Sequence, residues 1–406
     1  MSPSQHILIY AELLPNIRQV SVGCTLPTPV STATQATVSA DGRALTVAHH
    51  GSNQTIQLPE AVAPFSQLPI HNSGGTRLSW RLPLATPLTR RALAISEESV
   101  PWSATDLEPG STVACRTCES TIVGAGTLNV WKDLPSENWA EMMEFWHCHK
   151  PHNHAHHNNE EHLTNRGYGA SSRIAAQPGV GFVDLTSFLL ADSDLVTSSI
   201  SASASTNRAG NEAKVTVTTV TLHCTSCKAQ LGVRSDQAPS VSIFKWQVVV
   251  KQQNQAAPES SPNLAQCVSA MLLATMARSG CSKSVLLPIK AQTDCPRDGS
   301  KSEHGSRVQD VLNIWIFNAN ITFSSTEAST SPINAAKVLY RTVSQEEADK
   351  MVESITSDVQ EISLPSDAIT TIFGLLDRSN RLVPESDRKF KEWTIGLLEK
   401  WDGKGG

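Results

Sequence analysis

Two Cys-x-x-Cys pairs are the residues of this chain whose spacing best fits metal chemistry. They are Cys115 with Cys118 and Cys224 with Cys227. A tight turn brings the two thiolates of such a pair to one ion, and two pairs complete a tetrahedron, most often around zinc. We therefore expect the four cysteines to hold a structural zinc ion that joins distant parts of one domain. The alternative is two unrelated surface turns with reduced thiols, because roughly a hundred residues separate the pairs, unlike a short zinc-finger spacing.

A further cysteine, Cys148, lies between the pairs and is flanked by His147 and His149. Three interpretations are open. As a nucleophile, the Cys148 thiolate would form a thioester, since thiolates attack acyl carbons and a nearby imidazole lowers a thiol pKa. As a ligand, Cys148 would share a second metal site with His149 and with His152 or His154; as a packing residue, it would be a half-buried thiol. Adjacent residues on a helix do not face each other, so the His-Cys neighbours give weak support for a dyad.

The element that would position Cys148 is a helix predicted over residues 136–149, with Ser136 as its cap. Four apolar side chains with helical spacing form one stripe along it: Trp139, Met142, Met143 and Trp146. The helix would deliver Cys148 from its last turn. The histidine-rich stretch that follows, residues 150–166, has no apolar periodicity and is expected to be a solvated loop.

Strand-like segments surround both cysteine pairs. The first pair lies within residues 111–130, a hairpin-like context, and the second follows residues 214–223, in which Val alternates with Thr. Leu231 and Gly232 come after the second pair, so the order strand, Cys-x-x-Cys, turn, Gly is similar to the knuckle of a zinc ribbon. Rigid strands would therefore hold both pairs of thiolates in place.

The whole chain is predicted to be α+β. Residues 1–251 form a β-rich region that the four-cysteine zinc site staples, residues 252–262 are a linker, and residues 263–406 form an α+β region. In the last region we expect two strands within residues 311–324, a strand over 336–343 and several helices. The expected helices cover residues 264–276, 344–355, 367–380 and 384–401. The run 241–250 is expected to be one buried strand.

Composition excludes some classes of partner. The 406 residues carry a net charge of -5 and no basic stripe interleaved with aromatic side chains, so we expect no direct nucleic-acid binding. The first twenty residues resemble neither a signal peptide nor a membrane span, so we expect no membrane association. Nine cysteines, four of them in paired knuckles, fit a reducing compartment, and we expect the protein in the cytosol, the nucleus or both.

Several longer segments share features with one known family. They are CRTC, LPSENWAEMMEFWHCH, LHCTSCKAQLG, LNIWIFN, AKVLYR and LPSDAITTIFGLLDRSNRLVPESDRKFKEWTIGLL. Over roughly residues 5–400 the chain resembles the HECT-like family of ubiquitin-conjugating-enzyme-binding proteins. The segment with the Glu-Asn-Trp sequence and its Cys-His end is a marker specific to that family.

The resemblance implies a ubiquitin-protein ligase that docks a ubiquitin-charged conjugating enzyme and promotes transfer of ubiquitin to protein lysines. It further implies that Cys148 accepts ubiquitin as a thioester and that the cysteines 115, 118, 224 and 227 are zinc ligands. Members are also connected with the endonuclease of the pre-mRNA 3′-end cleavage machinery. The alternative function is therefore a non-enzymatic binding protein or assembly chaperone for that endonuclease.

One departure from true HECT ligases matters. Those enzymes carry the acceptor cysteine in a C-terminal lobe near a Thr-Cys-Phe signature, whereas no cysteine follows Cys295 in this chain. A shared name therefore implies neither a shared fold nor a shared mechanism. A ligase that only positions the charged conjugating enzyme, without a thioester of its own, is a further alternative.

Overall fold

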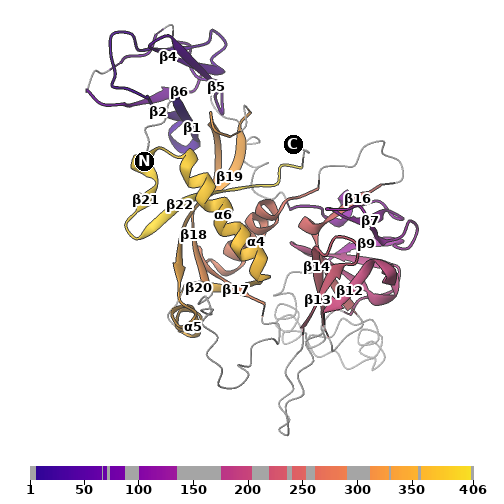
Figure 1. The fold of residues 1–406 in the computed structure, drawn as a ribbon. Helices are drawn as coiled ribbons and strands as arrows, with labels where there is room; N and C mark the ends of the chain where they lie inside the picture. The colour runs from indigo at the N-terminus through magenta and orange to yellow at the C-terminus, as the bar shows by residue number, and fades with distance from the viewer. Residues whose placement is uncertain are drawn as a thin grey trace, which may run out of the picture. The chain divides into compact units, whose positions relative to one another are not determined.

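The structure is a computed structural model, and it describes residues 6–65, 67–70, 74–86, 100–134, 175–203, 219–235, 240–252, 261–289, 311–328, 331–354 and 358–403. Within these ranges the protein is rich in β-strands and has three α-helices (Figure 1). No helix among them is long and apolar enough to cross a membrane. The chain divides into two compact units. Unit 1 comprises Met1–Ser99, Leu264–Ile289 and Ser302–Lys404, and unit 2 comprises mainly Val100–Asn263.

This division differs from the predicted one. The sequence predicts one region over residues 1–251, but strand β1 (Leu8–Leu14) pairs antiparallel with β18 (Val311–Ser325) and so joins the N-terminal and C-terminal segments of the chain in unit 1. The passage from unit 2 back to unit 1 falls at Leu264, beside the predicted linker 252–262. Long-range strand pairing of this kind leaves no local trace in a sequence.

Unit 1 is built on a nine-stranded sheet with the main order β21-β22-β19-β18-β1-β2-β6; β17 pairs with β18, and β20 pairs with β17. The remaining strands of this sheet are β2 (Gln19–Thr25), β6 (Arg77–Pro83), β17 (Lys283–Pro288), β19 (Ile333–Val343), β20 (Val359–Leu364), β21 (Lys389–Phe390) and β22 (Trp393–Glu399). A separate three-stranded sheet contains β3 (Gln35–Val38), β4 (Ala44–His49) and β5 (Ser52–Gln57). Strict alternation along β2 and β6 buries one face of each strand, as their sequences predict.

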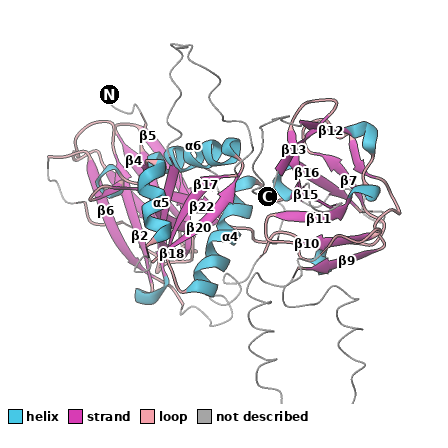
Figure 2. Ribbon diagram, turned by 90° about the horizontal axis from the view of Figure 1, so that it is seen from below, coloured by secondary structure: helices cyan, strands magenta, loops and turns pink. Residues whose placement is uncertain are grey.

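Three helices accompany the large sheet: α4 (Leu264–Ser279), α5 (Gln345–Glu353) and α6 (Ser366–Leu382). Helices α4 and α6 contact each other and strand β22, and α5 contacts β18 and β20 (Figures 1 and 2). The Ser344 hydroxyl caps α5 by accepting the Glu347 N–H at 3.2 Å. All three helices lie in segments for which the sequence predicts a helix.

The helix predicted over residues 384–401 is wrong. The segment contains the short hairpin of β21 and β22, and β22 pairs antiparallel with β19. Its apolar residues fit helical spacing, but a partner strand decides the outcome. Gly396 lets α6 pack closely on β22, because a Cβ there would lie 2.6 Å from Leu376 Cδ2 and would force that side chain to move. Lys391 turns the hairpin with a φ of 55°.

Two further strand predictions need correction. The two strands expected within residues 311–324 are one strand, β18, whose pairing with β19 shifts register around Asn318. The Asn318 side chain accepts the Asn320 N–H at 3.0 Å, which stabilises the irregularity without a turn. The single strand expected over 241–250 is two strands, because a short 3-10 helix, η5 (Lys245–Gln247), interrupts it.

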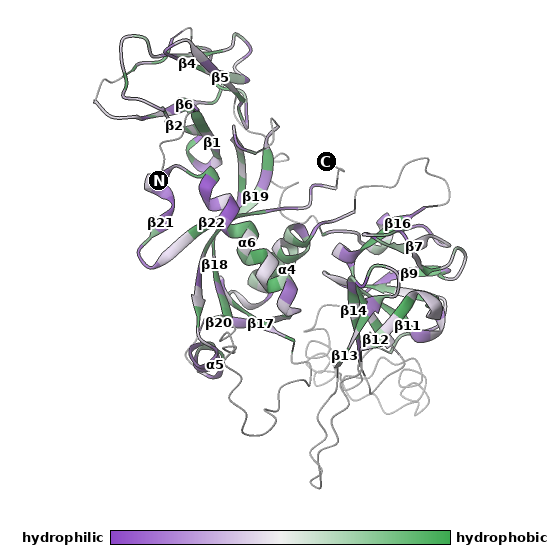
Figure 3. Cartoon of the chain, in the orientation of Figure 1, coloured by the Kyte–Doolittle hydropathy of each residue, from purple (hydrophilic) through white to green (hydrophobic). Residues whose placement is uncertain are grey.

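Unit 2 contains two sheets. The seven-stranded sheet has the order β12-β13-β14-β15-β11-β10-β9, and the three-stranded sheet has the order β16-β7-β8. The strands are β7 (Thr112–Cys115), β8 (Thr121–Val123), β9 (Val130–Asp133), β10 (Val180–Val183), β11 (Ser187–Ala191), β12 (Ile200–Ser203), β13 (Thr219–Cys224), β14 (Gln230–Ser235), β15 (Ser240–Phe244) and β16 (Val248–Lys251). Hydrophobic residues recur along the strands of both units (Figure 3).

A buried ion pair lies within unit 1. The Lys337 ammonium on β19 contacts the Glu12 carboxylate on β1, and the Tyr10 hydroxyl donates to the same carboxylate at 2.8 Å. The side chains of Lys337 and Glu12 are only 16% and 8% exposed. Burial and the Glu12 carboxylate raise the pKa of Tyr10 well above its usual value, so the phenol stays protonated and remains a donor.

We expect Glu12→Gln to lower the free energy of unfolding of unit 1 by about 3 kcal/mol, because it leaves the Lys337 charge buried without a counter-charge. The matched control is Arg77→Ala, which removes an ion pair with Glu385 whose side chains are 51% and 67% exposed. That change is expected to cost less than about 1 kcal/mol. Urea unfolding of both variants measures the difference, and equal losses would contradict the role given to the buried pair.

Candidate metal centre

The structure brings the four paired cysteines together. The sulfur atoms of Cys115, Cys118, Cys224 and Cys227 all lie within 4.8 Å of one another. Two of the distances join the two pairs directly: Cys115 Sγ to Cys227 Sγ is 3.6 Å, and Cys118 Sγ to Cys224 Sγ is 3.5 Å. A cluster of this size is compatible with one metal ion bound by four thiolates.

The backbone of the first knuckle explains how one short turn presents two sulfurs. Cys115 ends β7, and its N–H donates to the Ser120 carbonyl at 2.9 Å. The Glu119 N–H donates back to the Cys115 carbonyl at 2.9 Å, with Glu119 in the left-handed region at a φ of 58°. These two bonds close the turn, so that the sulfur atoms of Cys115 and Cys118 come within 4.8 Å of each other.

The second knuckle repeats the first bond for bond. The Cys224 N–H donates to the Ala229 carbonyl and the Lys228 N–H to the Cys224 carbonyl, both at 2.9 Å. Lys228 has a φ of 64°, like its counterpart in the first knuckle. After the knuckle, a Cβ on Gly232 would lie 2.0 Å from the Ser242 carbonyl oxygen, so only glycine allows β14 and β15 to approach this closely. The glycine that the sequence singles out after the second pair therefore has a steric cause.

Each knuckle hairpin also pairs with a third strand that is not part of the hairpin. Strand β16, which follows the second knuckle in sequence, pairs with β7 of the first hairpin, and β12, which precedes the second knuckle, pairs with β13 of the second. The Arg116 N–H donates to the Gln247 carbonyl at 2.9 Å, and the Thr225 N–H donates to the Ser199 carbonyl at 3.0 Å. Unit 2 thus contains an internal repeat, in which each knuckle hairpin has a third strand in the equivalent place.

The two cysteines of each knuckle differ in exposure. Cys115 and Cys224 are fully buried, Cys227 is partly exposed and Cys118 is exposed. Burial raises the pKa of the Cys115 thiol to about 12. The Ser120 hydroxyl, 3.3 Å from the sulfur, lowers the pKa of Cys118 to about 6. A bound cation would favour the thiolate at every one of these positions.

A second polar contact joins the knuckles beside the sulfurs. Ser120 Oγ lies 3.0 Å from Ser226 Oγ, so the two turns touch through hydroxyl groups as well as through the thiols. An ion pair also links the first knuckle to β16: the Lys251 ammonium binds the Glu119 carboxylate at 2.7 Å and lowers the pKa of that carboxyl. Both residues are exposed at this pair, so the contact orients the first knuckle and stabilises it only weakly.

A buried lysine, Lys245, lies just before the strand β16 that pairs with the first knuckle hairpin. Lys245 is 0% exposed, and its Nζ donates to the carbonyls of Pro101 at 2.6 Å and Trp102 at 3.0 Å. The ammonium also lies 5.7 Å from the centre of the Phe188 ring, which in turn stacks with Trp102. Because Lys245 begins η5, this network sets where β16 starts beside β7. No sequence pattern marks Lys245 as a site residue; its one signal is a lysine within an apolar run.

Other predicted site residues lie outside the described part of the chain. These are Cys148, its neighbours His147 and His149, and the helix predicted over residues 136–149. The histidines at 152 and 154, the alternative ligands with His149, also lie outside it. The catalytic role of Cys148 therefore stays a prediction.

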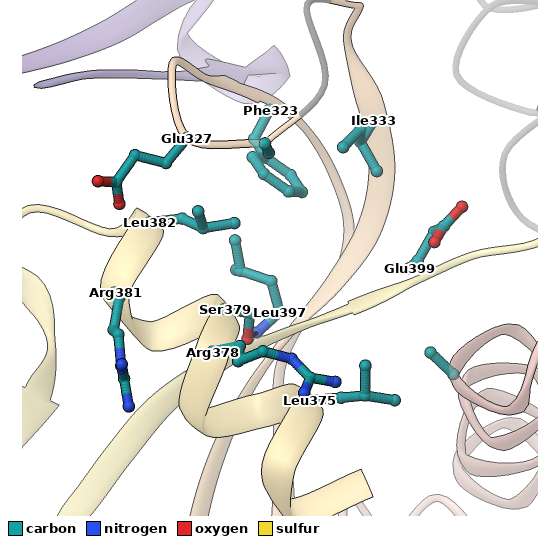
Figure 4. Close-up of a pocket in the computed structure, with 12 residues that line it drawn as sticks. Phe323, Glu327, Ile333, Leu375, Arg378, Ser379, Arg381, Leu382, Leu397 and Glu399 are labelled. Carbon is teal, nitrogen blue, oxygen red and sulfur yellow. Dashed lines mark hydrogen bonds between the residues drawn. The ribbon is translucent and has the colours of Figure 1, made fainter. Parts of the chain in front are cut away.

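Unit 1 contains an open cavity of about 640 Å³ (Figure 4). Phe323, Ile333 and Leu397 of the sheet and Leu382 of α6 provide apolar walls. Charged side chains stand around them, among them Arg378. None of the residues that line this cavity is among those for which the sequence predicts chemistry.

Comparison with known proteins agrees with the sequence resemblance. A family model described as HECT-like Ubiquitin-conjugating enzyme (E2)-binding matches residues 12–395, nearly the whole chain, so the protein belongs to this family. An uncharacterized protein of Schizosaccharomyces pombe is 26% identical over 319 residues, covering 75% of this chain and 79% of its own. An uncharacterized protein of Saccharomyces cerevisiae is 22% identical over 297 residues, covering 72% and 71%. No solved structure matches the chain.

We expect Cys227→Ser to abolish stoichiometric metal binding, because it leaves three of the four thiolates. Loss of a ligand that binds only the folded state lowers the free energy of unfolding by about 4 kcal/mol when free metal exceeds its dissociation constant 1000-fold. Elemental analysis and thermal melting measure both effects. Cys281→Ser, which removes a partly exposed thiol outside the cluster, is the matched control and should change neither. Unchanged metal content in Cys227→Ser would show that the four cysteines do not bind the metal together.

Proposed function

We propose that the protein is a ubiquitin-protein ligase that binds a ubiquitin-charged conjugating enzyme and promotes transfer of ubiquitin to protein lysines. The observation that carries the proposal is membership, over residues 12–395, of a family described as binding the ubiquitin-conjugating enzyme. Binding to the conjugating enzyme follows from that description. Transfer, and ubiquitin as a second partner, are the proposed steps beyond it.

We further propose that the four-cysteine centre holds zinc in a structural role. Four sulfur donors saturate a tetrahedral ion and leave no position for a water or a substrate, which is the composition of structural rather than catalytic zinc sites. The repeated knuckles present two thiolates each, and their sulfurs lie within 4.8 Å of one another. In this role the four ligands hold the two hairpins of unit 2 together and take no part in transfer.

For the transfer step we propose a thioester at Cys148. Its thiolate would attack the thioester carbonyl of the charged conjugating enzyme, and the conjugating enzyme's thiolate would leave. Exchange between two thioesters changes little free energy, so orientation of the reactants matters more than strong activation of the carbonyl. A cysteine is suited to this because it is nucleophilic and its acyl product stays reactive toward lysine amines.

The proposal predicts a reductant-sensitive ubiquitin adduct on the protein after incubation with activating enzyme, a panel of conjugating enzymes and ubiquitin. We expect Cys148→Ala to abolish the adduct, because it removes the acceptor sulfur. Cys281→Ala is expected to keep the adduct, because Cys281 is not the proposed acceptor. This variant therefore controls for non-specific transfer to an accessible thiol. Non-reducing gel electrophoresis measures the adduct.

Two other outcomes would redirect the proposal. Equal lysine ubiquitination by wild type and Cys148→Ala would replace the thioester by a ligase that only positions the charged conjugating enzyme. Binding to a conjugating enzyme without any transfer would leave a non-enzymatic binding protein, for which the pre-mRNA cleavage endonuclease is the partner to test. We propose the cytosol and nucleus as its location, where thiols stay reduced and available to metal.

A further inference from the structure

The internal repeat of unit 2 makes the two knuckles equivalent in backbone but not in reactivity. Cys118 and Cys227 occupy the same position in their knuckles, yet Cys118 is exposed and Cys227 only partly so. The residue two positions after Cys118 is Ser120, whose hydroxyl lies 3.3 Å from the sulfur, whereas the equivalent residue in the second knuckle is Ala229. Among the four sulfurs, Cys118 is therefore the one that a solute meets first.

Two close sulfur contacts connect the two hairpins with each other. Cys118 Sγ lies 3.5 Å from Cys224 Sγ, and Cys115 Sγ lies 3.6 Å from Cys227 Sγ. Each of these pairs contains one buried cysteine and one that solvent reaches. A disulfide has an S–S length of about 2.05 Å, so either pair must close by roughly 1.5 Å to form one.

We propose that Cys118 is an oxidation site for hydroperoxides, and that its oxidation converts the metal staple between the hairpins into a Cys118–Cys224 disulfide. The proposal does not depend on ligase activity. It assigns to the centre a second stable state in which the same two hairpins stay joined without metal. The observations behind it are the exposure of Cys118 and the 3.5 Å contact of its sulfur with the Cys224 sulfur of the other hairpin.

The chemistry balances as a two-electron oxidation. The Cys118 thiolate attacks one oxygen of the hydroperoxide, the O–O bond breaks, and the sulfur becomes a sulfenic acid while an alkoxide leaves and takes up a proton. For hydrogen peroxide the leaving group becomes water. The Cys224 thiolate then attacks the Cys118 sulfur, the S–O bond breaks, and the hydroxide released becomes water. Two sulfurs lose one electron each, and the peroxide gains both.

Loss of two thiolates releases the bound metal, because Cys115 and Cys227 alone cannot complete a tetrahedral site. The new bond spans the same two hairpins that the metal joined. Oxidised, metal-free protein is therefore expected to keep the fold of unit 2. Reduced, metal-free protein lacks both connections and is expected to melt at a lower temperature than the oxidised form.

The test uses the full-length protein loaded with zinc and then treated with hydrogen peroxide. A chromogenic chelator measures zinc release, and mass spectrometry of non-reduced peptides locates the disulfide. We expect release of about one zinc per chain together with a peptide linking Cys118 to Cys224, both reversed by a thiol reductant and added zinc. The control is Cys281→Ala, which removes a partly exposed thiol and should not change the zinc released.

Three results would overturn the proposal. One is zinc retained while other thiols oxidise. Another is a disulfide within one knuckle, Cys115 to Cys118 or Cys224 to Cys227, or between Cys118 and any cysteine other than Cys224. The third is an oxidised protein that melts no higher than the reduced, metal-free form. Because the disulfide is mapped in the wild-type protein, the test does not depend on a cysteine variant that still folds.

Discussion

Four sulfurs held within 4.8 Å of one another are the constraint on which unit 2 depends. Four thiolates cannot share so small a volume without a counter-charge, because like charges at this distance repel strongly. The two sulfurs of the first knuckle already differ in this respect, since burial raises the pKa of Cys115 while the hydrogen bond with the Ser120 hydroxyl lowers that of Cys118. A divalent cation bound by the four sulfurs would supply that counter-charge.

The third strand of each hairpin extends that constraint through the unit. Because β16, which follows the second knuckle in sequence, pairs with β7 of the first hairpin, the first knuckle depends on a segment more than a hundred residues away. Lys245 adds a second tie, since its ammonium binds carbonyl groups at Pro101 and Trp102 near the start of the unit. Unit 1 uses a different device, a large sheet in which β1 pairs with β18, about three hundred residues later in the chain, and in which β1 and β19 share a buried ion pair.

Local chemistry is what the sequence predicts well. The Cys-x-x-Cys spacing predicts the form of each knuckle, because a knuckle is closed by bonds within six residues. That the two pairs converge was expected on a different ground, since two pairs of thiolates complete one tetrahedral site. The helices α4, α5 and α6 were predicted, like the form of each knuckle, from local patterns. The end of the chain was not, since the residues around Gly396 fit both a helix and a strand, and pairing with β19, about sixty residues away in sequence, decided between them. Lys245 and the division of the chain also depend on distant partners. The predicted role of Cys148 stays untested by the described residues.

The pairing of β1 with β18 has a consequence for synthesis. Tyr10 and Ser325 are neighbours across this ladder, although about three hundred residues separate them in sequence. At a translation rate of about 5–20 residues per second, β1 waits on the order of 15 to 60 s for its partner. During that time its open edge, with the hydrogen-bonding groups that β18 later occupies, is exposed to other nascent chains. Translation speed and chaperone capture during this interval therefore bear directly on the yield of native protein.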